Sequence, residues 1–202
     1  MSRFAQVASA LAIVGATLMA APRAEGGLII DFEDLADGVT THLWEIGSYQ
    51  GFNWSNNFAS TNDASAGSGY AVMGTHFALT YFEETPIWMT TDDLSLTSIG
   101  SVDMISAWRT SNTWLVEGLV GGANGAVIYA TEVTMINTLV SHVDLNYVGV
   151  DTLKFTHLFD SGIDEGGGSG IHIALDNIVV PAPGSLALLA LAGLMGRRRR
   201  RG

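Results

Sequence analysis

The sequence predicts an all-β protein built as a two-sheet antiparallel β-sandwich of jelly-roll type. Three observations lead to this fold class. Short β-rich segments follow one another along the chain, and none of them has a convincing helical period. Turn-forming residues separate these segments, as at Asp37-Gly38 and in the glycine-rich run 161–170. The chain has 202 residues, of which 48% are hydrophobic, so it is long enough to bury the core of one domain.

The predicted strands begin with LIIDFE at 28–33 and end with IHIALDNIVV at 171–180. Both are rich in β-branched residues. Between them, the same pattern predicts strands at 51–55, 70–74, 76–82, 86–90, 101–108, 113–120, 126–136 and 152–159. Asn124-Gly125 lies between two of these segments and predicts a hairpin with a type I′ turn, because Asn-Gly accepts the positive φ angles that this turn requires.

Residues 1–24 are predicted to form a secretory signal peptide. Arg3 precedes an apolar stretch at 4–21, and small residues follow it, which is the order of parts in such a peptide. We place the cleavage point after Ala20 or Ala24. A single membrane anchor is the alternative, because the apolar run is close to the shortest length that spans a bilayer.

The folded domain is predicted to cover 25–180, because Pro181 and Pro183 cannot continue a strand ladder. A short apolar helix at 185–196 follows them, and a cluster of five arginines ends the chain. Arginines stay on the cytoplasmic side of a membrane, so this segment is predicted to be a short transmembrane sorting helix. The members of the cluster are Arg197, Arg198, Arg199, Arg200 and Arg201.

The tail at 181–202 resembles the PEP-CTERM sorting signal. The resemblance consists of the motif Pro181-Ala182-Pro183, the apolar helix and the arginine cluster, and Ala182 makes it the VPAP variant of the signal. It implies that an exosortase-type protease is a partner and that the membrane holds the chain until the tail is processed. It also implies delivery to the cell surface, the outer envelope or an extracellular polysaccharide matrix. A plain tail anchor is the alternative.

Charge and cysteine content exclude several classes of function. All twenty acidic residues lie within 25–176, where Arg109 and Lys154 are the only basic residues, so the domain has a net charge near −18. Such a domain repels phosphate backbones, which argues against nucleic-acid binding, and it attracts cations. The chain has no cysteine, which excludes disulfides and thiolate metal sites.

Three carboxylates on the first and last predicted strands suggest a structural calcium site. Asp31 and Glu33 share one strand face by period two, and Asp176 interrupts an apolar run. Terminal strands often lie side by side in jelly rolls, and calcium is the ion that suits several oxygen ligands. The pairing of IIDFED with ALDNIVV also resembles jelly-roll carbohydrate-binding modules, which implies that Glu33 and Asp176, with Asp31 as a third residue, bind Ca²⁺. Alternatively, Asp176 only satisfies backbone groups near a strand end.

The segment YQGFNWSNNF at 49–58 is the predicted ligand-binding edge. It mixes aromatic and amide side chains, which suit stacking on a sugar ring and hydrogen bonding to its hydroxyl groups. Tyr49, Asn53 and Trp54 are the candidate residues for contact with extracellular polysaccharide. The alternative is that these aromatic side chains belong to the core.

The sequence carries no catalytic signature, so we expect a non-catalytic structural or glycan-contacting protein rather than an enzyme. No G-x-S-x-G motif is present, and adjacent acids such as Glu83-Glu84 point to opposite faces of a strand. A secreted carbohydrate-active enzyme with a carboxylate site is the alternative function. It would require at least two carboxylates that converge in a cleft.

Overall fold

The computed structural model describes residues 27–35, 46–62, 76–80, 86–137, 139–163 and 170–182. Residues 27–181 form one compact unit, whose described residues contain twelve strands. The predicted signal peptide, the strand at 70–74, Pro183, the apolar helix and the arginine cluster lie outside the described residues. No helix in the described ranges has the length and apolar character needed to cross a membrane.

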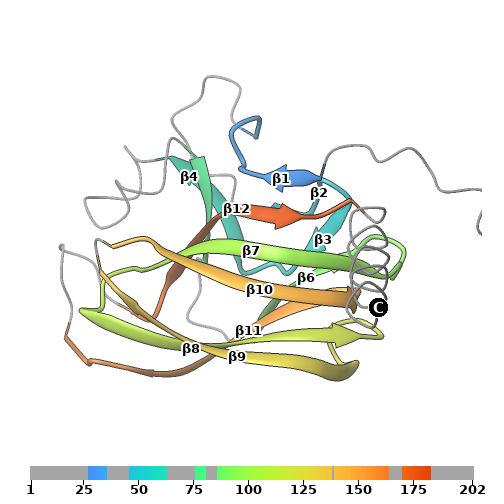
Figure 1. Ribbon diagram of the computed structural model, residues 1–202. Coiled ribbons are helices and arrows are strands. Elements are labelled where there is room, and N and C mark those ends of the chain that lie inside the picture. The colour runs from blue at the N-terminus through green and yellow to red at the C-terminus, as the bar shows by residue number, and fades with distance from the viewer. Residues whose placement is uncertain are drawn as a thin grey trace, which may run out of the picture. The chain divides into compact units, whose positions relative to one another are not determined.

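The strands form two antiparallel sheets that pack face to face, which confirms the predicted two-sheet sandwich (Figure 1). The sheet that contains both terminal strands is called sheet A. Its strand order is β10-β7-β12-β5-β4, and β1 pairs with β12. Its members are β1 (Leu28–Ile30), β4 (Phe58–Asn62), β5 (His76–Thr80), β7 (Thr97–Ser106), β10 (Ser141–Val150) and β12 (Ile173–Val180).

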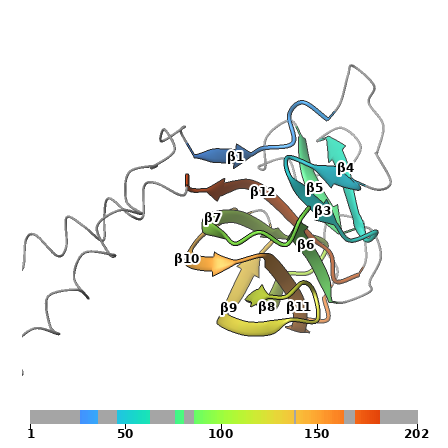
Figure 2. The same cartoon turned by 90° about the vertical axis from the view of Figure 1, so that its right-hand side faces the viewer.

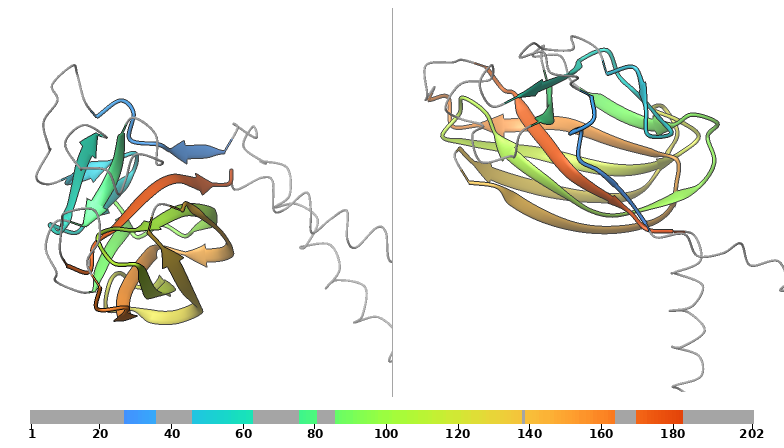
Figure 3. Two further views of the ribbon diagram at one scale, coloured as in Figure 1. Left: turned by 90° about the vertical axis from the view of Figure 1, so that its left-hand side faces the viewer. Right: turned by 90° about the horizontal axis from the view of Figure 1, so that it is seen from above.

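Sheet B has the order β2-β3-β6-β11-β8-β9. Its members are β2 (Ser48–Tyr49), β3 (Phe52–Trp54), β6 (Ile87–Thr91), β8 (Ser111–Val120), β9 (Ala126–Ile136) and β11 (Thr152–Asp160). The long strands β8, β9 and β11 lie next to one another at one side of the sandwich, as the view from above also shows (Figure 3).

Alternation along the strands explains how the sheets pack. In β6, Ile87 and Met89 are fully buried in the core while Trp88 between them is partly exposed. Trp114 on β8 and Phe155 on β11 are among the largest fully buried side chains. Burial of such side chains supplies the main favourable term in folding, about 2 kcal/mol each by area. The chain therefore builds its core without disulfides.

The first and last strands lie side by side, as predicted (Figure 2). Ile30 of β1 is opposite Ile178 of β12, and Leu28 is opposite Val180. The predicted strand at 28–33 is too long, because β1 ends at Ile30. Phe32 has a φ of 59° and is fully buried, so simple alternation does not continue through Asp31 and Glu33.

Two local predictions differ from the structure. The hairpin between β8 and β9 exists, but Asn124 and Gly125 do not have the positive φ angles of a type I′ turn; Gly121 and Gly122 have them instead. The strand β10 was not predicted. Polar and apolar residues alternate from His142 to Tyr147, and burial alternates with them, so the pattern of a half-buried strand is present in the sequence. Positive φ angles at Asn146 and Gly149 and two shifts of register against β7 make the strand irregular.

Candidate functional site

Four carboxylates gather around the junction of β1, β7 and β12 in sheet A. We call Asp31, Glu33, Asp103 and Asp176 the acidic seam. Asp176 of β12 is directly opposite Asp103 of β7, and the pairing of β1 with β12 brings Asp31 and Glu33 to the same region. Leu175 and Ile178 are core residues, and a shift of register between β12 and β7 follows Asp176. The structure thus groups the three predicted residues and adds Asp103.

Asp176 is the most buried member of the acidic seam, with 3% of its surface exposed. Burial raises the pKa of Asp176 to about 7, and the negative charges of Glu33, Asp103 and Asp31 contribute to the rise. The backbone N–H of Asn177 donates to Asp176 Oδ1 at 2.7 Å, and this hydrogen bond partly offsets the rise in the pKa. The side-chain Nδ2 of Asn177 also donates to Asp176 Oδ2, at 3.3 Å. The carboxyl group therefore titrates near neutral pH.

A hydrogen-bonded network continues from Asp176 across sheet A. Asn177 Nδ2 also donates to Asp103 Oδ2 at 3.1 Å, so one amide group links two carboxylates. Asp103 Oδ1 lies 2.6 Å from His142 Nδ1, and this hydrogen bond raises the pKa of His142. On this side the amide donates hydrogen bonds to the carboxylates, and the imidazole supplies a positive charge when it is protonated.

On the other side of the seam, Glu33 contacts β5. The backbone N–H of His76 donates to Glu33 Oε1 at 3.2 Å, and His76 Nδ1 lies 3.6 Å from Oε2. Carboxylate and amide oxygens are the ligands that Ca²⁺ prefers, so the donor types of the seam suit this ion. Among the described residues, however, no three His, Asp or Glu side chains lie close enough together to hold a metal ion.

The predicted binding residues Tyr49, Asn53 and Trp54 do not converge. Trp54 is only 4% exposed and makes edge-to-face contacts with Phe32 and Phe58 in the core. Tyr49 stacks on Phe32, and its hydroxyl group donates to Asp34. Burial and this hydrogen bond raise the pKa of Tyr49. Asn53 is exposed and lies between two core residues of β3, so it faces away from the core.

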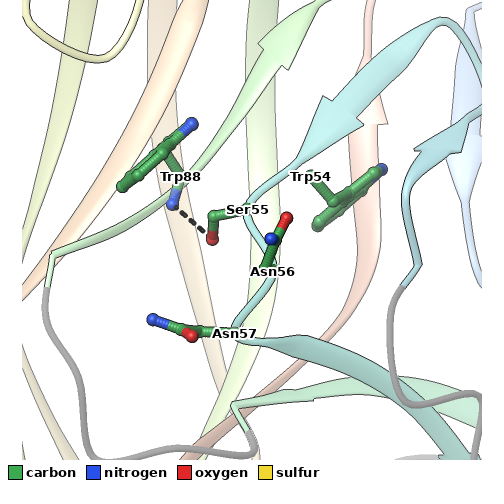
Figure 4. Close-up of a pocket in the computed structure, with 5 residues that line it drawn as sticks. All are labelled: Trp54, Ser55, Asn56, Asn57 and Trp88. Carbon is green, nitrogen blue, oxygen red and sulfur yellow. Dashed lines mark hydrogen bonds between the residues drawn. The ribbon is translucent and has the colours of Figure 1, made fainter.

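A pocket nevertheless opens beside Trp54, with a volume of about 360 Å³. It is lined by Trp54, Ser55, Asn56, Asn57 and Trp88 (Figure 4). Asn56 is exposed, whereas Asn57 and Trp88 are partly exposed. The pocket thus combines an aromatic ring with two amide side chains that are accessible to a ligand.

Hydrogen bonds attach Ser55, at the start of the loop between β3 and β4, to β6. The N–H of Ser55 donates to the carbonyl oxygen of Trp88 at 2.9 Å, and the N–H of Trp88 donates to Ser55 Oγ at 3.2 Å. Two hydrogen bonds, one between backbone groups and one to the Ser55 side chain, therefore hold the residue after β3 against β6. Asn56 and Asn57 belong to the predicted segment 49–58. Trp88 comes from a distant strand, and only the tertiary structure brings it to this position.

Comparisons with known proteins show similarity of fold alone. No protein-family model and no curated protein sequence matches the chain. The K1 cleaved adhesin domain of Lys-gingipain from Porphyromonas gingivalis W83 is similar with a TM-score of 0.42 and 15% identity, over 70% of this chain and 98% of that one. The K2 cleaved adhesin domain of Lys-gingipain has a TM-score of 0.40 and 13% identity, over 76% and 97% of the two chains.

An enzyme structure is similar to the same degree. Arabinose-bound MgGH51 α-L-arabinofuranosidase gives a TM-score of 0.45 and 13% identity, over 79% of this chain and 27% of that chain. These similarities carry no argument about its function, which has to come from its own residues.

Proposed function

We propose that this protein is an exported, non-catalytic β-sandwich that contacts polysaccharide at the cell surface or in the extracellular matrix. The observation that carries the proposal is the pocket in which Trp88, Asn56 and Asn57 meet. An aromatic face and amide groups are complementary to a sugar, which has an apolar ring face and hydroxyl groups at its edge. A volume of about 360 Å³ is within the range of small-ligand sites.

Two properties of the pocket support a carbohydrate rather than a charged ligand. Among the residues that the structure describes, its lining consists of two tryptophans, one serine and two asparagines and includes no charged side chain. Trp88 faces outward on sheet B beside Lys154, whose ammonium group is paired with Glu117 at 2.9 Å. The charges next to the pocket thus neutralise each other, and hydrogen bonding and stacking remain as the means of recognition.

The test is a binding screen of the full chain against a panel of soluble polysaccharides, followed by titration of the best ligand. We expect Trp88→Ala to weaken binding at least about tenfold, because it removes the exposed aromatic face of the pocket. Asn56→Ala should weaken binding as well. Phe159→Ala is the matched control, because Phe159 is an exposed aromatic residue, 61% accessible, outside the pocket lining.

Two outcomes would contradict this proposal. If no polysaccharide binds, the pocket is not a glycan site. If Phe159→Ala and Trp88→Ala reduce binding equally, the contact lies elsewhere on the surface.

We also propose that Asp31, Glu33 and Asp176 hold a structural Ca²⁺ ion in the exported protein, which requires the three carboxylates to move closer together than they lie in this structure. The support is physical: a carboxyl group that is 3% exposed and close to three others is costly to ionise without a cation. Calcium would supply the positive charge and would join β1 to β12 and β7. Two neighbouring side chains offer further oxygen ligands for the ion. Asp103 is opposite Asp176 on β7, and Asn177 is hydrogen-bonded to Asp176.

The burial of Asp176 also bears on the alternative of a carbohydrate-active enzyme. A general acid or base must reach a bond of the substrate. Asp176 has a pKa near 7, which suits such a role, but only 3% of its surface is exposed. Substrate therefore has no direct access to its carboxyl group, and the proposal of a structural role for the seam fits this burial better.

A further inference from the structure

The strand β9 is a long exposed edge of sheet B (Figure 1). Its eleven residues, Ala126–Ile136, pair with β8 on one side. Within the described residues no strand pairs with the other side, where an isolated bridge with Leu139 occupies the last residue, Ile136. Such an edge presents a row of N–H and C=O groups that can accept one more strand. Val127, Ile128 and Ile136 add apolar surface, because they are 49%, 52% and 52% exposed.

The other sheet edges are shorter or interrupted. In sheet B, β2 has two residues. In sheet A, β10 has two shifts of register against β7 and carries the exposed acid Asp144. Bulges and charges are the usual means by which natural proteins prevent pairing at an edge. β9 also has one register shift, which leaves Ile128 without an opposite residue on β8. It contains no proline or lysine, however, and Glu132 is its only charged residue.

Contacts with the opposite sheet hold β9 in place. Tyr129 stacks on Tyr147 of β10, with ring centroids 4.8 Å apart, and its hydroxyl group donates to the carbonyl oxygen of Val148. The hydroxyl group of Tyr147 donates to Thr131 Oγ1 at 2.8 Å. An edge that is already rigid loses little conformational entropy when another strand binds to it.

From these observations we infer that β9 is a self-association surface, on which a second copy of this chain adds its own β9 in antiparallel orientation. The charge distribution limits where a second copy can bind. Two domains with a net charge near −18 repel each other, so they can meet only where acids are sparse. The long edge with one acid in eleven residues satisfies this condition, whereas the seam face of sheet A does not.

The sequence of β9 also favours one register. Pairing around a two-fold axis at Thr131 overlaps residues 127–135, which leaves Ile136 in its bridge with Leu139, and places Glu132 opposite Ala130 of the partner subunit. An axis at Glu132 would instead place this acid opposite its own copy, which is unfavourable. Because β2, the other edge of sheet B, has two residues, the assembly closes as a dimer and does not extend into a fibre.

The test is sedimentation equilibrium of the full chain in a nonionic detergent, over a range of protein and salt concentrations. We expect a reversible monomer–dimer equilibrium. Ala130→Lys places a lysine opposite Glu132 of the partner subunit twice in each dimer, and it should lower the dimer Kd about three- to tenfold at low salt. Ala130→Glu should raise the dimer Kd by a similar factor. Ala130 is exposed, so both variants should fold.

Two controls separate this interface from other causes. Leu96→Lys and Leu96→Glu introduce the same charges at a side chain that is 60% exposed and outside β9, and they should not differ in dimer Kd. Glu132→Gln combined with Ala130→Lys should remove the gain. Glu117, the neighbour of Ala130 on β8, is already paired with Lys154. A monomer at all concentrations, or a dimer whose Kd is the same in both Ala130 variants, would overturn the inference.

Discussion

Asp176 carries its carboxyl group in the least accessible position of the acidic seam. It is 3% exposed, whereas the side chains of Asp103 and Glu33 are 20% and 43% exposed. A pKa near 7 in the folded state means that the native protein binds this proton more tightly than the unfolded chain does. The stability that the proton provides is complete below the unfolded pKa of Asp176 and is lost as the pH rises toward 7.

This titration predicts how stability depends on pH and calcium. In EDTA, the free energy of unfolding of the full chain should fall by about 2 kcal/mol between pH 5 and pH 8, because Asp176 ionises without a counterion. Millimolar Ca²⁺ should reverse much of this loss and raise the melting temperature. Asp176→Asn should remove both the fall and the effect of calcium.

Thermal melts of both proteins at several pH values provide the measurement. Asp144→Asn is the control, because the side chain of Asp144 is 77% exposed and lies outside the seam. An unchanged melting temperature on addition of Ca²⁺ would refute the proposed ion. A pH profile that Asp176→Asn does not alter would show that another group causes the titration.

At the scale of elements, the β8–β9 hairpin depends on a carboxylate from another connection. Asp151, which is 2% exposed, lies between β10 and β11. Its carboxylate accepts hydrogen bonds from the N–H groups of Gly121 and Gly122, at 2.6 and 3.0 Å, and from Thr152 Oγ1 at 2.7 Å. Burial raises the pKa of Asp151, but these donors outweigh burial and hold the pKa below its ordinary value.

Asp151→Ala should therefore destabilise the protein by about 2 kcal/mol at pH 7, because two partly buried hydrogen bonds from N–H groups lose their charged acceptor. Urea unfolding of the full chain measures this change. Asp144→Ala, at an exposed acid, should change the free energy of unfolding by less than about 0.5 kcal/mol. Equal effects of the two substitutions would mean that the Asp151 contacts do not anchor the hairpin.

For the whole molecule, the distribution of charge supports the proposal of export. The acidic residues lie in the domain, while the arginine cluster follows an apolar segment at the end of the chain. This order agrees with a tail that stays at the cytoplasmic face of a membrane during translocation. The domain would then carry its negative charge outside the cell, where divalent cations are available.

This proposal predicts a processed protein. The form recovered from the envelope or the medium of producing cells should lack about the first 24 residues and the part of the tail after 181–183. Intact mass spectrometry of that fraction measures the mass of the protein and shows whether both segments have been removed. Replacing the five arginines with glutamine should leave the tail uncut in the membrane fraction. A full-length protein in the cytoplasm would contradict export.

Much of the architecture follows from the sequence alone, because alternation and turn residues act locally. The strand at 126–136 is predicted to the residue, and the antiparallel two-sheet arrangement is confirmed. Grouping Asp31, Glu33 and Asp176 needed one additional assumption, that the terminal strands pair, and the structure supports it. The strand β10 was not predicted, although polar and apolar residues alternate from His142 to Tyr147. What this local pattern does not contain is the positive φ angles and the register shifts of β10.

Only the tertiary structure decided which side chains share a site. Trp54 proved to be a core residue, because a ring of that size between Phe32 and Phe58 is excluded from water. Trp88 lines the same pocket as Asn56 and Asn57 because β6, which carries Trp88, pairs with β3, which precedes the two asparagines. The sequence determined the composition, the acidic charge and the strands. The pairing of distant strands, which depends on long-range packing, determined the pocket, the acidic seam and the exposed edge at β9.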